Sequence, residues 1–294
     1  MNVAVIGAGR MGAAMVRRLR AAGVPVVVFN RSRDKAEAVA DRHGAYVAAT
    51  ARDAVAGADI AIVSLADDAA LRAAYSGDDG LLAGVRWGLI ICETSTVAPA
   101  TVRELAPRVA ERGGKLLDTP VSGSVPLVER GELSIMAGGD SHALEVARPV
   151  LDQLAKAVFH LGDVGAGATM KLVVNGVVHA LNVAVSEALV LAERAGLDRA
   201  ATYEVLAGSA VAAPWVHYKQ DAFLRPDEAD VAFSLDLVAK DQILIGSLAR
   251  SVGASMQQAE ATKNLVAAAV AAGLGEQDMS AMAQYLRRQS RYIT

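Results

Sequence analysis

The chain has 294 residues, of which 53% are hydrophobic and 21% charged, and its formal net charge is −3. This length predicts one large or two ordinary domains, and the slightly negative charge argues against the basic surface that nucleic-acid binding needs. The single cysteine, Cys92, excludes an internal disulfide framework, and the five histidines lack metal-ligand spacing. Because no cationic leader precedes the first apolar run, we expect a cytoplasmic protein.

Residues 2–6 (NVAVI) form a β-rich apolar run that leads into Gly7, Gly9 and Gly12. A helical pattern and a second apolar run at 25–30 follow, so the order is strand, G-x-G-x-x-G, helix, strand. In a dinucleotide-binding turn the first glycine allows the turn, the second admits a pyrophosphate, and the third lets the helix pack on the strand. We therefore expect phosphates to bind at this helix N-terminus. The residues concerned are Gly7, Ala8, Gly9, Arg10, Met11 and Gly12.

The residues after the second apolar run bear on the choice of nicotinamide dinucleotide. An acid there would bind the ribose 2′-hydroxyl of NAD, but the chain has Asn30, Arg31 and Ser32. Arg31 can form charge-assisted bonds with a 2′-phosphate, and the other two side chains can donate neutral ones. The sequence therefore favours NADP(H) over NAD(H). The alternative is that Arg31 is a solvated loop residue and Ser32 is an ordinary helix N-cap.

Apolar runs and helical patterns go on alternating, which predicts an α/β domain with a parallel sheet. We expect further strands at 45–49, 59–66, 88–94, 115–119, 133–138 and 157–161, and helices at 33–42, 51–56, from 99 onward and at 142–155. Open α/β sheets bind ligands at the carboxyl ends of their strands. The loops expected there carry Leu65 and Ala66, Thr96, and Ser122, Gly123 and Ser124.

The Ser122–Ser124 loop lies within the sequence PVSGS. Small polar residues with a glycine can present hydroxyls and backbone N–H groups to a carboxylate, although such a sequence can also be a simple turn.

From Gly162 to Gly196 the chain reads as a glycine-rich turn followed by one long, almost wholly apolar helix. Its polar residues recur at steps of four, four, three and four, which confines them to a stripe about 80° wide. Since the rest of the helix is apolar, this polar stripe must face a cleft or another polar surface. Its members are Lys171, Asn175, His179, Asn182 and Ser186.

Lys171 stands at the start of this helix, where a cleft between two domains would open, and we expect it to be the catalytic proton donor. For His179, Asn182 and Ser186 a structural role at a subunit interface is the simpler interpretation. Because the apolar segment at 172–192 carries polar residues, we expect no membrane span.

The remaining sequence is helical in pattern at 198–208, 214–225, 234–252, 256–272 and 278–288. We therefore predict a nucleotide-binding α/β domain at 1–164 and a helical domain at 165–294, with the boundary at the glycine-rich turn before the long helix. Phe233 and Lys240, seven residues apart, are expected to share a helix face. By itself the pair Lys240–Asp241 would be a solvated pair on a helix surface.

Four motifs in this order resemble the β-hydroxyacid dehydrogenase family, the group of 3-hydroxyisobutyrate dehydrogenase, tartronate semialdehyde reductase and the glyoxylate/succinic semialdehyde reductases. The motifs are GAGRMG at 7–12, DTPVSGS at 118–124, GAGATMKLVVN at 165–175 and FSLDLVAKD at 233–241. The resemblance runs end to end. It implies a Rossmann domain, a helical domain, and a homodimer or homotetramer held partly by the long helix.

The resemblance also implies roles for individual residues. Lys171 matches the catalytic lysine, with Asn175 one turn further on, and Ser122 and Gly123 match the loop that holds the substrate carboxylate. Thr96 and Lys240 match cofactor-contacting positions, and Asp241 lies beside the site. Phe233 is expected to contact substrate.

Three departures from the family pattern leave the substrate open. Ser124 replaces a glycine of the substrate loop, Val174 replaces an asparagine, and Trp215 brings a bulky ring to a region expected to border the cleft.

The sequence thus predicts an oxidoreductase that transfers hydride between NADP(H) and a small carbonyl or β-hydroxy acid bearing a carboxylate, without a metal. An imine reductase and an NAD-dependent 3-hydroxyisobutyrate dehydrogenase remain alternatives. An NADP-binding scaffold or sensor without turnover is the alternative outside enzymes.

Overall fold

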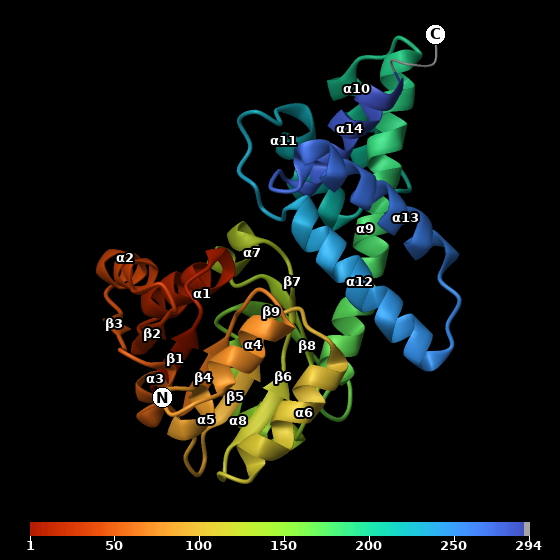
Figure 1. The fold of residues 1–294 in the computed structure, drawn as a ribbon. Helices are drawn as coiled ribbons and strands as arrows, with labels where there is room; N and C mark the ends of the chain where they lie inside the picture. Colours follow the sequence, from red (N-terminus) through yellow and green to blue (C-terminus); the bar gives the residue numbers. More distant parts are fainter. Residues whose placement is uncertain (291–294) are drawn as a thin grey trace. The chain divides into compact units, whose positions relative to one another are not determined.

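The computed structural model describes residues 1–290, and the chain divides into two compact units, Met1–Lys171 and a second that starts at Leu172. The strands belong to the first unit, and the described part of the second is built of helices (Figure 1). This confirms the predicted fold class, in which a Rossmann domain precedes a helical domain.

The first unit is built on a six-stranded, wholly parallel sheet in the order β3-β2-β1-β4-β5-β6. The order changes direction between β1 and β4, which is where open α/β sheets bind ligands. The strands are β1 (Val3–Ile6), β2 (Val26–Phe29), β3 (Tyr46–Val47), β4 (Ile60–Val63), β5 (Ile90–Glu93) and β6 (Lys115–Asp118).

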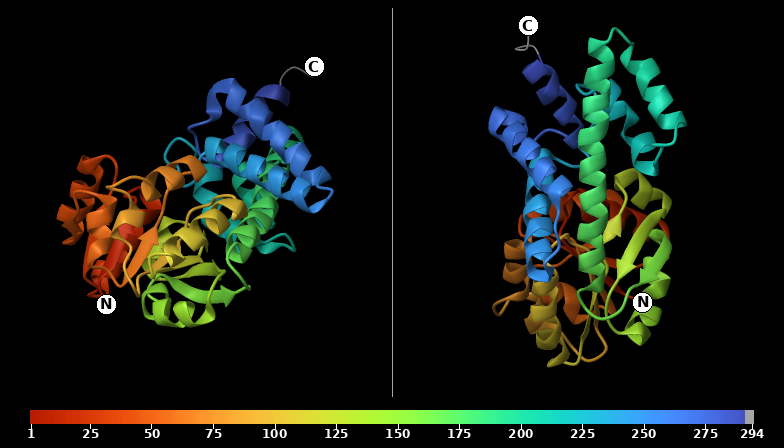
Figure 2. Two further views of the ribbon diagram at one scale, coloured as in Figure 1. Left: turned by 60° about the horizontal axis from the view of Figure 1, so that its bottom comes forward. Right: turned by 90° about the vertical axis from the view of Figure 1, so that its right-hand side faces the viewer.

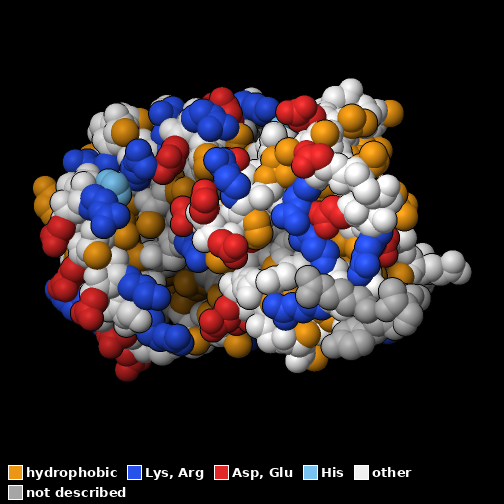
Figure 3. Space-filling model, turned by 90° about the horizontal axis from the view of Figure 1, so that it is seen from above, with side chains coloured by type: hydrophobic (Ala, Val, Ile, Leu, Met, Phe, Trp, Pro, Cys, Tyr) orange, Lys and Arg blue, Asp and Glu red, His pale blue; other side chains and the backbone are white. Residues whose placement is uncertain are grey.

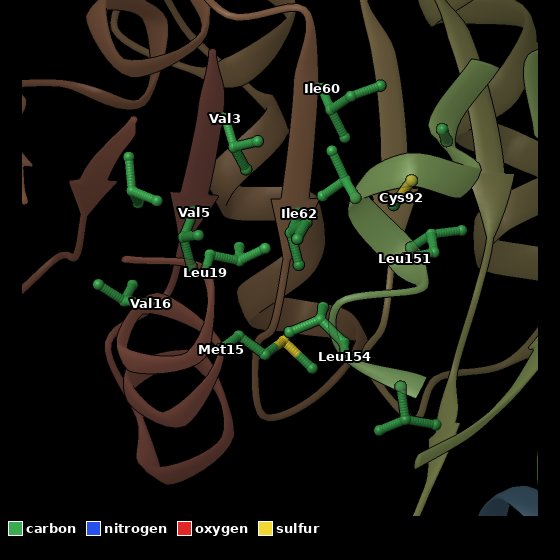
Figure 4. Close-up of a cluster of buried hydrophobic side chains, with 14 of the residues drawn as sticks. Val3, Val5, Met15, Val16, Leu19, Ile60, Ile62, Cys92, Leu151 and Leu154 are labelled. Carbon is green, nitrogen blue, oxygen red and sulfur yellow. The ribbon is translucent and has the colours of Figure 1, made fainter. Parts of the chain in front are cut away.

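Helices cover both faces of this sheet, which explains why β1 and β4 are buried along their whole length. Val3 and Val5 pack into one core with residues of α1 and α8, and the alternate Ala4 and Ile6 pack into a second core on the other face. Figure 4 shows Met15 and Leu19 of α1 among the side chains of the first core. The helices are α1 (Arg10–Ala21), α2 (Arg33–His43), α3 (Ala51–Ala56), α4 (Asp68–Tyr75), α5 (Leu81–Gly84), α6 (Pro99–Ala110) and α8 (Ser141–Leu151).

A second sheet of three strands, in the order β7-β8-β9, completes the first unit. Its strands are β7 (Val121–Ser122), β8 (Leu133–Ala137) and β9 (Ala155–His160), and β7 runs antiparallel to β8. The sequence indicated only a loop around PVSGS, whereas the structure has β7 followed by the short helix α7 (Val125–Arg130). Helices α4, α5 and α7 were not predicted, because elements of one or two turns show too little periodicity.

The second unit is organised around α9 (Ala166–Arg194), which begins in the first unit. Figure 2 shows it as one continuous helix. The other helices are α10 (Arg199–Gly208), α11 (Pro214–Leu224), α12 (Leu235–Val252), α13 (Gln257–Ala269) and α14 (Met282–Gln289). They follow the predicted ranges, except that a 3₁₀ turn at Met279–Ala281 precedes α14 and a π-helical turn at Val270–Leu274 follows α13.

Among the described residues, α9 is the one helix long and apolar enough to cross a membrane by length and composition. The core helix of a soluble protein passes the same test. His179, Asn182 and Ser186 are each at most 2% exposed and hydrogen-bonded, which is the environment of a core helix. On the face of the molecule drawn in Figure 3, basic and acidic side chains are interspersed.

Candidate functional site

The turn between β1 and α1 depends on three glycines, each for a different reason. Gly7 has a φ of +105°, and a Cβ there would lie 2.1 Å from the carbonyl oxygen of Ser64. A Cβ at Gly12 would lie 1.9 Å from the carbonyl oxygen of Gly7, so helix and strand approach too closely for any side chain. A Cβ at Gly9 would meet nothing within 4 Å. The backbone at Gly9 is therefore bare, as close approach of a pyrophosphate requires.

The N-terminus of α1 is open to an anion. Its N-cap residue, Gly9, has no side chain to cap the helix, and its first turn contains no acid. The Asn30 carboxamide holds the turn in place, since Oδ1 accepts from the N–H of Ala8 at 3.0 Å and Nδ2 donates to the carbonyl of Ser32 at 2.9 Å. The uncapped N–H groups and the positive end of the helix dipole fit a dinucleotide phosphate.

The loop after β2 presents Arg31 and Ser32, both exposed. Ser32 is the N-cap residue of α2, but its side chain makes no capping hydrogen bond. Arg33 pairs with Glu37 at 2.7 Å, whereas Arg31 makes no ion pair or side-chain hydrogen bond with residues 1–290. The Arg31 guanidinium and the Ser32 hydroxyl are thus available to a ligand.

The loops after β4 and β5 are joined by Ser95, which the sequence analysis did not single out. The N–H of Leu65 donates to Oγ of Ser95 at 2.8 Å, and the N–H of Ser95 donates to Oε1 of Glu93 at 2.9 Å. This chain of bonds links the Leu65–Ala66 loop to the one that carries Thr96. Burial raises the pKa of Glu93 to about 8.

Asp118, at the end of β6, connects two of the sequence motifs. Its Oδ1 accepts from the N–H of Gly165 at 2.8 Å, and its Oδ2 accepts from the N–H of Ala168 at 2.7 Å. The carboxylate thereby caps α9, and burial raises its pKa while these N–H groups lower it. The helix start is tightly packed, because a Cβ at Gly167 would lie 2.3 Å from the carbonyl oxygen of Met136. Lys171, half-buried, follows one turn later.

The substrate loop expected from the sequence follows Asp118. Ser122 lies in β7 opposite Ser134, and Gly123 has a φ of +137° with Leu133 so close that a Cβ would lie 2.6 Å from it. Neither Ser122 nor Ser124 uses its hydroxyl in a hydrogen bond with the described part of the chain, so both are available to a polar ligand.

A polar cluster in the second unit is centred on Asp241, which is fully buried. Asn175 donates from Nδ2 to Oδ2 of Asp241 at 2.6 Å, and Nε2 of His179 lies 3.3 Å from the same oxygen. Nζ of Lys240 is 3.0 Å from Oδ1. The polar stripe of α9 therefore meets α12 here, and Lys240–Asp241 is not the solvated pair that the sequence alone would favour.

Two aromatic residues differ from their predicted placement. Phe233 precedes Ser234, the N-cap residue of α12, so it does not share a helix face with Lys240; its ring stacks on His179 with centroids 5.9 Å apart. Trp215 is 5% exposed and meets Phe223 edge-on in the core of the second unit, where it acts as a packing residue.

Comparison with known proteins agrees with this geometry. Residues 2–162 match the family described as the NAD binding domain of 6-phosphogluconate dehydrogenase. Residues 165–286 match the family described as NAD-binding of NADP-dependent 3-hydroxyisobutyrate dehydrogenase.

Relatives are similar along the whole chain. NAD-dependent L-serine dehydrogenase of Pseudomonas aeruginosa is 33% identical over 95% of each chain. Glyoxylate/succinic semialdehyde reductase 2, chloroplastic, of Arabidopsis thaliana is 32% identical over 98% of this chain and 80% of its own. The solved structure of Mycobacterium tuberculosis 3-hydroxyisobutyrate dehydrogenase with L-serine is 32% identical, with a TM-score of 0.84 over 97% of this chain and 99% of that one. The protein therefore belongs to the β-hydroxyacid dehydrogenase family and is one of its NAD(P)-dependent oxidoreductases.

Proposed function

We propose that the protein transfers hydride between NADP(H) and a small semialdehyde or aldehyde acid, or the corresponding β-hydroxy acid, with Lys171 as proton donor and acceptor. The observation that carries the proposal is the link made by Asp118. Its carboxylate holds the first turn of the helix on which Lys171 stands. The strand that ends at Asp118 also leads into the Ser122–Ser124 loop. A carboxylate anchor and a proton-exchanging amine are thus built from one rigid group of elements.

Lys171 and the Ser122–Ser124 loop have separate roles in the proposed reaction. When bound, the nicotinamide supplies or accepts the hydride. In reduction, the ammonium of Lys171 donates a proton from Nζ to the oxygen that becomes the hydroxyl, and in oxidation the neutral amine removes that proton. Hydroxyls of Ser122 and Ser124 and the backbone of Gly123 hold the carboxylate, which fixes the distance from the anchor to the reacting carbon.

Asn175 lies one turn beyond Lys171 on α9. Because its Nδ2 is committed to Asp241, its Oδ1 is left to accept a hydrogen bond from the lysine or from the substrate hydroxyl. Asp241 acts through Asn175, so it is a positioning residue.

The available Arg31 and Ser32 side chains and the absence of an acid among residues 30–33 support NADP(H) as the cofactor. A second candidate, NAD(H), is favoured by the NAD-dependent L-serine dehydrogenase among the relatives.

The deciding measurement is the rate of NADPH loss, beside that of NADH, with succinic semialdehyde, glyoxylate and a cyclic imine as separate acceptors. We expect rapid loss of NADPH with an aldehyde acid. Loss with the imine alone would overturn the substrate class. If no acceptor causes loss of NADPH or NADH, the oxidation of hydroxy acids with NADP and with NAD is measured next. A protein that is inactive in that assay as well would be a nucleotide-binding protein without turnover.

The Lys171→Ala variant tests the catalytic assignment. We expect kcat to fall by roughly 10²–10⁴, because the proton transfer loses its donor, while NADPH affinity stays nearly unchanged. Lys263→Ala is the control, since that partly exposed lysine pairs with Glu260 on its own helix. Near-wild-type turnover of Lys171→Ala would remove Lys171 from this role.

A further inference from the structure

His179 occupies a position on the polar stripe that the proposed chemistry does not yet use. It follows Asn175 by one turn of α9 and is 2% exposed. On one side its Nε2 is 3.3 Å from Oδ2 of Asp241, the oxygen that also accepts from Asn175. On the other side its ring stacks on Phe233 with an interplanar angle of 24°. One imidazole thus contacts both a buried carboxylate and an aromatic ring.

The contact with Asp241 has a defined direction. A carboxylate oxygen accepts hydrogen bonds and cannot donate them, so the ring must donate through Nε2. Nδ1 is buried and has no hydrogen-bond partner within residues 1–290. The hydrogen-bonding role of His179 in the described structure is therefore directed at Asp241. Together with the hydrogen bond from Asn175 and the ion pair with Lys240, this contact restricts the rotation of the carboxylate.

The residue whose ring stacks on His179 is itself held in place through its backbone. The N–H of Phe233 donates to Oδ2 of Asp278 at 3.2 Å, and the carbonyl of Phe233 accepts from the N–H of Met279 at 2.8 Å. Asp278 is in turn fixed by Lys219, whose Nζ lies 2.7 Å from both carboxylate oxygens. Lys219 is 3% exposed, so Phe233 is attached to a buried ion pair.

The other members of the stripe differ from His179 in what they bind. Nδ2 of Asn182 donates to the carbonyl of Met279 at 2.9 Å, and the hydroxyl of Ser186 donates to the carbonyl of Asn182 at 2.7 Å. Both bonds end on backbone and fix the helix, as expected of structural polar residues. His179 instead binds a side chain of the polar cluster.

We propose that His179 is a positioning residue with two separable effects. Through Nε2 it orients Asp241, and thereby Asn175, which governs turnover. Through its ring it fixes the position of Phe233, and the position of Phe233 governs the choice of substrate. The inference rests on the proposed function, because it assigns Asp241 and Phe233 to the same reaction.

Two substitutions separate the contacts. His179→Phe keeps a ring against Phe233 but removes the donor to Asp241. His179→Gln keeps an N–H donor at about the reach of Nε2 but removes the ring. Ser186→Ala is the matched control, because this residue is fully buried on the same stripe and its hydroxyl donates to a carbonyl of its own helix.

For His179→Phe we expect kcat to fall roughly 10–100-fold with KM for the aldehyde acid nearly unchanged, since a misdirected catalytic group costs about this much. For His179→Gln we expect kcat within about threefold of wild type, a higher KM and altered preference between glyoxylate and the longer succinic semialdehyde. Ser186→Ala should match wild type within about twofold. Equal loss of kcat in both His179 variants would overturn the separation and reduce His179 to a packing residue.

Asp241→Asn provides a readout that packing alone would not change. If His179 acts through the carboxylate, His179→Phe should lower kcat further by less than about twofold in the Asp241→Asn background. The same 10–100-fold loss in both backgrounds would overturn the proposal. If the wild-type protein turns over substrate and His179→Phe has the same kcat, this inference alone is wrong. If the wild-type protein is inactive with every substrate, the proposed function is wrong and this inference with it.

Discussion

At the scale of single residues, the proposed preference for NADP(H) depends on Arg31 and Ser32. Both side chains lie at the end of β2, and neither makes a side-chain hydrogen bond with the described residues. A 2′-phosphate differs from a 2′-hydroxyl mainly in its negative charge, so a guanidinium at this point distinguishes the two ligands by electrostatics. Asn30 has a different task, because its carboxamide already ties the glycine-rich turn to this loop.

At this scale we predict that Arg31→Ala weakens NADPH binding at least about tenfold, since one charged hydrogen-bonding contact is worth roughly 1.5–3 kcal/mol. NADH binding should change by less than about twofold. Fluorescence titration of both nucleotides at constant ionic strength measures this, with Arg33→Ala as control because Arg33 pairs with Glu37. An equal loss of affinity for both nucleotides would refute the 2′-phosphate assignment.

At the scale of elements, β5 and β6 end in two buried carboxyl groups, Glu93 and Asp118, which are direct partners in the strand register. Their surroundings differ. Asp118 receives two N–H donors from the start of α9, whereas Glu93 receives one from Ser95, and its Oε2 has no hydrogen-bond partner within residues 1–290. Burial accordingly dominates at Glu93 and raises its pKa from 4.5 to about 8.

This shift predicts a pH-dependent stability. Between about pH 4.5 and 8 the folded protein keeps a proton on Glu93 that the unfolded chain has lost. The free energy of unfolding therefore falls as the pH rises through this window, and the contribution is complete only below about 4.5. Glu93→Gln is neutral at every pH and keeps the acceptor for Ser95. We expect it to leave Tm nearly unchanged at about pH 5 and to raise it by several degrees at about pH 9.

Thermal unfolding of wild type and Glu93→Gln at the two pH values tests this expectation. Glu104→Gln serves as control, because Glu104 is exposed and pairs with Arg72, so its effect should be small at both pH values. A Tm difference between wild type and Glu93→Gln that does not change with pH would show that Glu93 is charged in the folded protein throughout.

At the scale of the whole molecule, the sequence predicts what is periodic or local. The parallel sheet and the helices of the second unit carry repeating apolar patterns, and the glycine-rich turn is readable because each glycine has a local steric reason. The contacts that build the candidate site are long-range. Asp118 meets its donors 47 and 50 residues later, and Asn175 meets Asp241 66 residues later. Nothing in a single sequence specifies such pairs, so Asp118 and Ser95 could not be assigned.

The division of the chain within α9 leads to a last prediction. The first turn of α9 packs with the first unit, since Ala168 belongs to one of its cores and donates, together with Gly165, to the Asp118 carboxylate that caps the helix. A fragment of residues 1–164 lacks both donors and leaves the buried Asp118 carboxylate without them, whereas a fragment of residues 1–171 retains both.

We expect the longer fragment to be more stable by roughly 2–6 kcal/mol, at about 1–3 kcal/mol for each lost bond to a buried group, and its Tm to be higher by about 5–20 °C. In an Asp118→Ala background the two fragments should differ much less, because the carboxylate that needs the donors is gone. Equal stability of the two original fragments would instead place the end of the folding unit at residue 164, and would reduce the capped turn to a connection between domains. A difference that depends on Asp118 would make the base of the Lys171 helix an integral part of the nucleotide-binding unit.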